Sequence, residues 1–281
     1  MNSPDAASSR IRMLATDLDG TLLRSDGTVS DRTREALRAA DAAGLLIAFV
    51  TGRPPRWLDE VIETTGHLGV AVGANGAVLY DLARELVLRA HFLQPPALAE
   101  LARDLRAAFP DVQFAAEYGD GFAAEPGYVH DWQINPRADR QGRPIAPPVV
   151  GELGEVLARP AMKLLAKDRA ADADDFLTVA VDVIGERASV THSSSFGLLE
   201  IGAPGVTKAS GLADLAGSHG IGAAEIIAVG DMPNDVPMLV WAGTSYAVAN
   251  AHPAAVAAAG AVLGSNDEDA VAVLIESLLA G

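Results

Sequence analysis

Two aspartates stand directly behind a short apolar run near the N-terminus, in the segment Asp17-Leu-Asp19-Gly-Thr. The run 11–16 predicts a buried strand, so both carboxylates follow the carboxyl end of that strand. In open α/β sheets this edge is where ligands bind. An extended chain would place both side chains on the same side, where two anions repel each other unless a cation lies beside them. Taken alone, the segment is also typical of an Asp-rich turn. With the segments described next, it predicts a metal site whose oxygen ligands suit Mg²⁺.

A second apolar run, 45–50, predicts another buried strand and ends in Thr51, Gly52 and Arg53. A hydroxyl, a free backbone N–H and a guanidinium at a strand end together form a plausible cradle for an oxyanion. For Arg53 an ordinary ion pair with a surface carboxylate is the competing interpretation.

Two further segments carry charged or polar residues that suit an anion or metal site. Lys208 begins a predicted helix, where a cation is unfavourable for the helix dipole, and this indicates a role in holding an anion. The run 225–229 predicts a fourth strand and is followed by Asp231, Asn234 and Asp235 just before a helix. The competing interpretations are a solvated lysine and a strand-to-helix turn in which Asn234 or Asp235 caps the helix.

The order of these four motifs resembles the haloacid dehalogenase superfamily of phosphotransferases. Each motif is weak alone, but four in order over nearly the whole chain are a specific signal. The segments 73–77, 205–208 and 230–238 are similar to those of the Cof-type phosphatases. This resemblance implies a large α/β cap of the C2B type inserted after the third strand. The long stretch between the first two of these segments has room for such a cap.

The pattern of strands and helices predicts the same architecture. A chain of 281 residues is long enough for a core and an inserted domain. Regular alternation at both ends predicts an α/β fold with a doubly wound, Rossmann-like parallel sheet, interrupted by an α+β cap domain. We expect the catalytic core to span residues 1–83 and 191–281 and the cap, which would set substrate specificity, to span 84–190.

Composition limits the cofactors, cellular location and partners that we expect. The absence of cysteine excludes a disulfide framework, and six histidines without metal-ligand spacing argue against zinc. The polar residues 1–10 lack the apolar stretch of a signal peptide, and the longest alanine-rich run, 254–263, is too short to span a bilayer. We therefore expect a cytoplasmic protein without a membrane partner. A net charge of −16 argues against nucleic acid. The expected partner is a small phosphate ester, and the chain is expected to be a monomer or a weak homo-oligomer.

The resemblance implies a role for each motif residue. Asp17 would be the nucleophile that forms an aspartyl-phosphate, and Asp19 the general acid and then the general base, with a pKa raised by burial and neighbouring carboxylates. Mg²⁺ would be held by the Asp17 carboxylate, the Asp19 backbone carbonyl and Asp231, with Asp235 supporting these ligands. The phosphoryl oxygens would be bound by Thr51, Gly52, Arg53, Lys208 and Asn234.

The main functional expectation is thus a Mg²⁺-dependent phosphatase for a small phosphorylated metabolite such as a sugar phosphate. A phosphomutase or phosphotransferase would use the same aspartyl-phosphate, and a non-catalytic phosphometabolite-binding protein would be expected to lack Asp17 or Asp19. Substrate choice would fall to the cap, where Tyr118 and Trp132 could line a sugar pocket, although aromatic side chains are more typical of a domain core. Asn75, which precedes a glycine, is also typical of an ordinary turn. The candidate cap residues are Glu117, Tyr118, His130, Asp131, Trp132 and Asn135.

Overall fold

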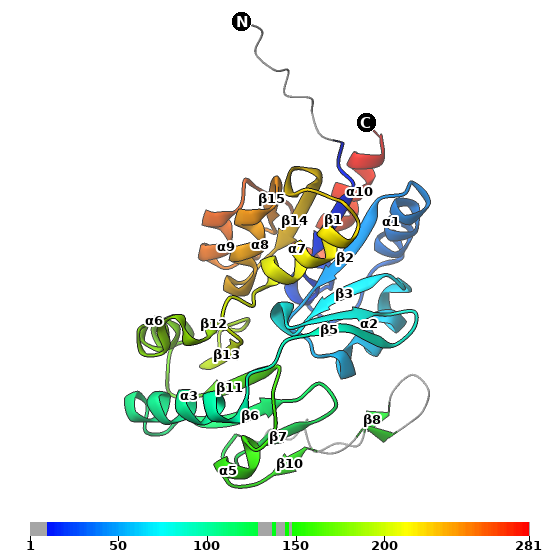
Figure 1. Ribbon diagram of the computed structural model, residues 1–281. Coiled ribbons are helices and arrows are strands. Elements are labelled where there is room, and N and C mark those ends of the chain that lie inside the picture. The colour runs from blue at the N-terminus through cyan, green and yellow to red at the C-terminus, as the bar shows by residue number, and fades with distance from the viewer. Residues whose placement is uncertain (1–9, 129–136, 139–143, 146–147, 281) are drawn as a thin grey trace, which may run out of the picture.

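The computed structural model describes residues 10–128, 137–138, 144–145 and 148–280, which form two sheets with their own helices (Figure 1). The larger sheet has the strand order β16-β15-β14-β1-β2-β3-β4-β5. Its strands from β16 to β3 are parallel, and β4 and β5 run antiparallel to their neighbours. The strands are β1 (Met13–Thr16), β2 (Leu46–Val50), β3 (Val70–Gly73), β4 (Val78–Asp81), β5 (Leu86–Ala90), β14 (Ile226–Gly230), β15 (Thr244–Ala247) and β16 (Ala261–Val262).

Helices cover both faces of this sheet, which is why its central strands are apolar without interruption. Leu14 of β1 packs with α1, α2 and α10, whereas Met13 and Ala15 of the same strand pack with α7, α8 and α9. The predicted doubly wound α/β fold is confirmed. The helices are α1 (Asp31–Ala42), α2 (Leu58–Thr65), α7 (Lys208–Ser218), α8 (Val236–Trp241), α9 (Pro253–Ala258) and α10 (Ala270–Ala280).

The second sheet belongs to the inserted cap, and its strand order is β10-β7-β6-β11-β13-β12. Its pairs are antiparallel except β10 with β7. Three helices pack on one face of it, around Phe114, Leu164 and Phe176. The elements are β6 (Gln113–Glu117), β7 (Phe122–Ala124), β10 (Val149–Val150), β11 (Lys163–Lys167), β12 (Ser189–Thr191), β13 (Leu198–Gly202), α3 (Pro95–Ala108), α5 (Leu153–Val156) and α6 (Ala173–Ile184), beside a separate pair β8 (Arg137–Ala138) and β9 (Pro144–Ile145).

Strand pairing divides the chain at different residues from the boundaries expected at 84 and 190. The expected boundaries assign β5 to the cap and β13 to the core. In the structure β5 extends the core sheet by pairing with β4, and β13 lies between β11 and β12 in the cap sheet. The difference arises because a hairpin strand shows its length and periodicity in the sequence but not the sheet that it joins.

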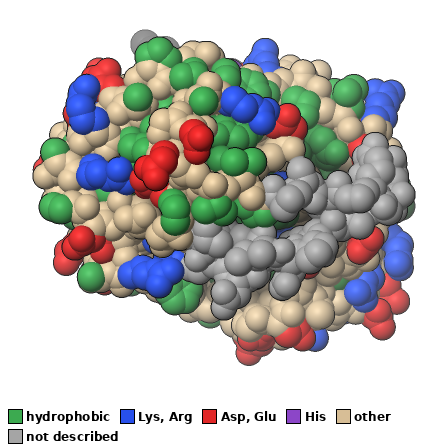
Figure 2. Space-filling view, turned by 90° about the horizontal axis from the view of Figure 1, so that it is seen from below, with side chains coloured by type: hydrophobic (Ala, Val, Ile, Leu, Met, Phe, Trp, Pro, Cys, Tyr) green, Lys and Arg blue, Asp and Glu red, His purple; other side chains and the backbone are tan. Residues whose placement is uncertain are grey.

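The other face of the cap sheet looks toward the core. Leu164 and Ala166 of β11 pack under the cap helices, so Lys163 and Leu165 point the opposite way, toward the carboxyl ends of the core strands. The cap seen from below shows acidic and basic side chains interspersed over its described surface (Figure 2). Among the described helices, none combines the length and apolar character that a membrane span requires.

Gly76 allows the segment after β3 to pack closely against the start of α7. Its φ is +97°, and a Cβ built on it would lie 2.0 Å from the carbonyl oxygen of Thr207. We expect Gly76→Ala to lower the free energy of unfolding by about 2 kcal/mol or more, because alanine is strained at positive φ and no space is left for its methyl group.

Chemical denaturation would measure this loss, with Gly217→Ala as the matched control. Gly217 is exposed in α7 and has no atoms near its Cβ position, so alanine should be neutral or slightly stabilising there. Equal stability of the Gly76→Ala protein and the wild type would contradict the close packing at this position.

Candidate active site

Four segments that are distant in the sequence meet at one edge of the core sheet. Asp17 follows β1, Thr51 follows β2, and Asp231 follows β14. These strands are parallel neighbours, so their carboxyl ends lie side by side. Lys208, the first residue of α7, completes the group from the adjoining helix.

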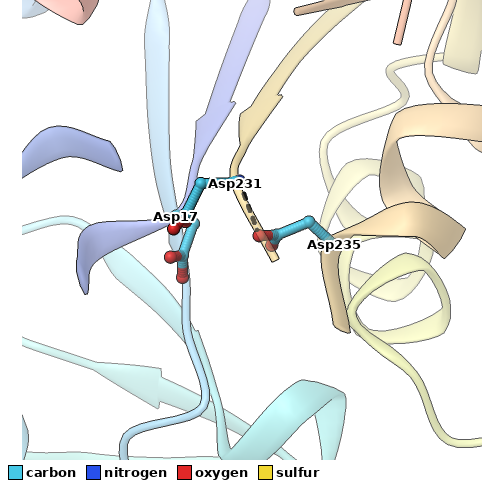
Figure 3. Close-up of side chains that lie close together, drawn as sticks. All are labelled: Asp17, Asp231 and Asp235. Atoms are coloured by element: carbon cyan, nitrogen blue, oxygen red, sulfur yellow. Dashed lines mark hydrogen bonds between the residues drawn. The ribbon is translucent and has the colours of Figure 1, made fainter. Parts of the chain in front are cut away.

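Three buried carboxylates form the centre of the site (Figure 3). Asp17, Asp231 and Asp235 each offer an oxygen atom, and these atoms lie within 4.8 Å of one another. Asp235 is held from behind, because its Oδ2 accepts the backbone N–H groups of Asp231 (2.9 Å) and Met232 (3.0 Å). On the other side, Thr21 Oγ1 donates to Asp231 Oδ1 at 2.8 Å. The cluster is therefore built by the loop after β14 and the turn after β1.

Lys208 is the cation within this cluster. Its side chain is fully buried, and its Nζ donates to Asp17 Oδ1 at 2.7 Å and to Asp235 Oδ1 at 2.6 Å. Burial alone would lower the pKa of Lys208, but the two carboxylates outweigh it and the pKa is raised. The lysine at the start of the helix thus pairs with anions, as its unfavourable position at the helix dipole indicated.

The charges in the cluster fit a divalent cation with oxygen ligands. Three carboxylates face one ammonium group, which leaves two negative charges uncompensated. Burial, and then repulsion from Asp235, raises the pKa of Asp231 to about 6. Burial is also the main reason that the pKa of Asp17 lies well above its ordinary value. A site of this kind is consistent with Mg²⁺.

The Asp19 side chain is more exposed than we expected from the sequence. The chain leaves β1 at Asp17 and enters a tight turn over Leu18–Leu22, so the strand alternation no longer applies. Here Gly20 has a φ of +79°, and a Cβ on it would lie 2.5 Å from Asp231 Oδ2. The Asp19 side chain is 58% exposed, so the burial that we expected for it is absent.

Arg53 is the partner of Asp19. Its Nε and Nη2 donate to the two carboxylate oxygens at 2.8 and 2.6 Å, in a bidentate pair. The same loop carries Thr51, whose buried hydroxyl accepts the backbone N–H of Arg53 at 3.1 Å. Thr51, Gly52 and Arg53 therefore all lie at the site, with Arg53 paired to a carboxylate.

Asn75 and Asn234 connect this edge to the cap. Asn75 has a left-handed backbone with a φ of +56°, and its Oδ1 accepts from Asn234 Nδ2 at 3.1 Å. Its Nδ2 donates to Glu200 of β13 at 3.0 Å. Asn234 Oδ1 is buried without a partner among the described residues. Sequence reasoning missed Glu200 and its partner Lys163. For Glu200 the available signal was a charged residue inside an otherwise apolar strand, whereas Lys163 begins a strand that also ends in a lysine.

A cavity of about 280 Å³ lies between the acidic cluster and the cap sheet. Glu117, a predicted cap residue, is buried there and accepts from Arg56 Nη1 at 2.5 Å. Tyr118 packs in the cap core instead, with its hydroxyl donating to the Val156 carbonyl at 2.5 Å. His130, Asp131, Trp132 and Asn135 lie outside the described residues. The cap wall of the cavity consists of Glu117, Phe122, Tyr128, Lys163, Leu165, Ser193, Leu198 and Glu200.

Comparison with known proteins agrees with this geometry. A family model of the haloacid dehalogenase-like hydrolases matches residues 14–275. The 5-amino-6-(5-phospho-D-ribitylamino)uracil phosphatase YitU of Bacillus subtilis strain 168 is 27% identical over 263 residues, covering 92% of this chain and 94% of the relative. The pyridoxal phosphate phosphatase YbhA of Escherichia coli K12 is 28% identical over 279 residues, covering 95% and 98%. The crystal structure of SMU.1108c from Streptococcus mutans UA159 has a TM-score of 0.82 at 25% identity, covering 96% of this chain and 100% of that one.

The family model spans most of the chain, and the alignments with the two phosphatases cover more than nine-tenths of it. The two-sheet architecture with an inserted cap also agrees with the solved relative. The resemblance inferred from the four motifs is therefore confirmed: the chain belongs to the haloacid dehalogenase-like hydrolases, in their Cof-type subgroup, and is a phosphatase of phosphoric monoesters.

Proposed function

We propose that the protein is a Mg²⁺-dependent phosphatase that hydrolyses a small phosphorylated metabolite, such as a sugar phosphate, through an aspartyl-phosphate on Asp17. One observation carries this proposal. Asp17 lies in a buried carboxylate cluster with a lysine, at the carboxyl edge of a parallel sheet, and lines the cavity that faces the cap sheet. The two phosphatases that match the chain are named for small phosphorylated compounds, and this supports a substrate of the same class for this protein.

In the first half of the reaction, an Asp17 carboxylate oxygen attacks phosphorus. A bond forms between that oxygen and phosphorus while the bond from phosphorus to the ester oxygen breaks, and the departing oxygen takes a proton from Asp19. Lys208 already contacts Asp17 at 2.7 Å, so its ammonium group lies where negative charge gathers on the phosphoryl oxygens. Thr51, the Gly52 backbone N–H and Asn234 are the other proposed phosphoryl ligands.

The Asp19–Arg53 pair must open before Asp19 can act as an acid. A carboxylate held by two guanidinium hydrogen bonds has no proton to give. An incoming phosphate group offers Arg53 another anionic partner at the same loop. We propose that Arg53 moves from Asp19 to the phosphate, after which the exposed Asp19 carboxylate takes up a proton from solvent and passes it to the departing ester oxygen.

In the second half, water attacks the aspartyl-phosphate. Asp19 takes a proton from the water, the new oxygen–phosphorus bond forms, and the bond to the Asp17 oxygen breaks to release inorganic phosphate. The Asp17 carboxylate, the Asp19 backbone carbonyl and Asp231 would hold the Mg²⁺, with Asp235 keeping Asp231 in place. When bound, this cation supplies positive charge that offsets the repulsion between nucleophile and phosphate.

Replacing the nucleophile tests the proposal directly. We expect Asp17→Asn to reduce phosphate release from p-nitrophenyl phosphate by about a thousandfold or more, because an amide oxygen cannot form the acyl-phosphate. Phosphate release would be measured with Mg²⁺ and with EDTA, and over a panel of metabolite phosphates. Asp175→Asn, at an exposed position in α6, is the matched control and should leave the rate unchanged. Equal rates for Asp17→Asn and the wild type would contradict the role of Asp17, and a requirement for a bisphosphate activator would favour a phosphomutase.

Replacing Asp231 should change the melting temperature in opposite directions with and without Mg²⁺. Its pKa of about 6 lies above its ordinary value, so in EDTA its ionised form destabilises the fold above pH 6, and this cost is lost as the pH falls toward 4. We therefore expect Asp231→Asn to raise the melting temperature in EDTA at pH 8, with a gain that shrinks at low pH. In Mg²⁺ at pH 8 the wild type should be the more stable protein, because only it retains the full ligand set.

Thermal unfolding with and without Mg²⁺ at several pH values measures both effects, again with Asp175→Asn as the control. The metal assignment would be contradicted if Mg²⁺ stabilised the wild type and Asp231→Asn equally.

A further inference from the structure

A buried ion pair of the cap sheet reaches into the core loops. Lys163 of β11 and Glu200 of β13 have side chains only 7% and 6% exposed, and Nζ lies 2.5 Å from Oε2. Both line the cavity opposite the acidic cluster. A buried ion pair contributes little net stability compared with apolar side chains of the same size. The contacts that each partner makes beyond the pair are therefore of interest.

Lys163 holds the loop after β2. Its Nζ donates to the carbonyl oxygen of Gly52 at 2.7 Å. The same peptide unit carries the N–H of Arg53, which donates to Thr51 Oγ1. Because a peptide unit is planar, anchoring its carbonyl also orients that N–H, and with it the Thr51 hydroxyl. A cap lysine thus acts on the side chain that we propose as a phosphoryl ligand.

Glu200 determines how two side-chain amides are oriented, first that of Asn75 and through it that of Asn234. Burial alone would raise its pKa, but the Lys163 ammonium outweighs this and holds the pKa below its usual range, so the carboxylate is ionised and can only accept hydrogen bonds. Asn75 must then turn its Nδ2 toward Glu200 and its Oδ1 toward Asn234. Asn234 in turn must present its Nδ2 to Asn75.

We propose that Lys163 and Glu200 are a positioning pair, through which the cap aligns the phosphoryl ligands Thr51 and Asn234 when it lies on the core. The proposal rests on the proposed function, since it assigns these two residues a part in phosphate binding. Neither residue reacts. Each acts through a core residue, Lys163 through the Gly52 peptide and Glu200 through Asn75. The phosphate site is complete only with the cap seated.

The test uses the full-length protein with Mg²⁺ and compares Glu200→Ala, Glu200→Gln, Asn75→Gly and the Glu200→Ala/Asn75→Gly double variant. Glycine suits the left-handed backbone at position 75, so that variant removes the amide without strain. Asp174→Asn is the matched control, because Asp174 of the cap contacts His252 of the core at 3.2 Å and does not line the cavity. Calorimetry measures binding of inorganic phosphate, and p-nitrophenyl phosphate gives kcat and KM.

We expect Glu200→Ala and Asn75→Gly each to weaken inorganic phosphate binding and to lower kcat by about tenfold, because a misplaced ligand loses alignment with the phosphoryl group. The double variant should be no worse than the poorer single variant, since both break one chain of contacts. Glu200→Gln keeps an acceptor for Asn75 and should restore phosphate affinity to near the wild-type value. Asp174→Asn should retain both phosphate affinity and kcat.

Additive losses in the double variant, or equal losses in Asp174→Asn and Glu200→Ala, would overturn the proposal, because both results indicate general loosening of the cap. Unchanged phosphate affinity in Glu200→Ala and Asn75→Gly would overturn it as well. Failure of the proposed function looks different, since the wild type itself would then neither bind inorganic phosphate with Mg²⁺ nor hydrolyse p-nitrophenyl phosphate.

Discussion

The ammonium group of Lys208 makes the rest of the site possible. It lies between Asp17 and Asp235, within 2.7 Å of a carboxylate oxygen of each, and it is entirely buried. Without it, the three carboxylates would be packed at the end of the sheet with no cationic side chain of the described residues in direct contact, and burying unpaired charges is costly. Its contacts also tie the start of α7 to the ends of β1 and β14. One interaction therefore joins the proposed nucleophile, the loop that supports the proposed metal ligands, and the helix that packs against Gly76.

The two sheets contribute different groups to the site around Lys208. The core sheet supplies the proposed reacting and phosphate-binding groups at its carboxyl edge, and the cap sheet supplies the opposite wall. The chain as a whole carries a net charge of −16, yet four cationic side chains lie at the site. Three of them are paired with acids, Arg53 with Asp19 and Glu60, Arg56 with Glu117, and Lys163 with Glu200. The uncompensated negative charge therefore lies in the carboxylate cluster beside Lys208. The four cations are Arg53, Arg56, Lys163 and Lys208.

The sequence was sufficient where local signals determine the structure. Apolar runs that end in polar motifs identified β1, β2 and β14, because strands buried on both faces are apolar throughout. It was insufficient where a contact depends on the three-dimensional path of the chain. Asp19 was expected beside Asp17, but the turn over Leu18–Leu22 directs it toward Arg53. Lys163 and Glu200 were missed because their contacts with Gly52 and Asn75 join the cap sheet to loops of the core, and spacing along one strand cannot reveal such contacts.

The central claim is that the phosphoryl group passes through Asp17, and the most direct test is to trap it there. The wild type would be mixed with p-nitrophenyl phosphate and Mg²⁺, quenched in acid during turnover, digested and analysed by peptide mass spectrometry. The account predicts one added phosphoryl group on the peptide that contains Asp17, lost on treatment with hydroxylamine as expected for an acyl-phosphate. A phosphoryl group on a different residue, or active turnover with none trapped on Asp17 at any quench time, would contradict it.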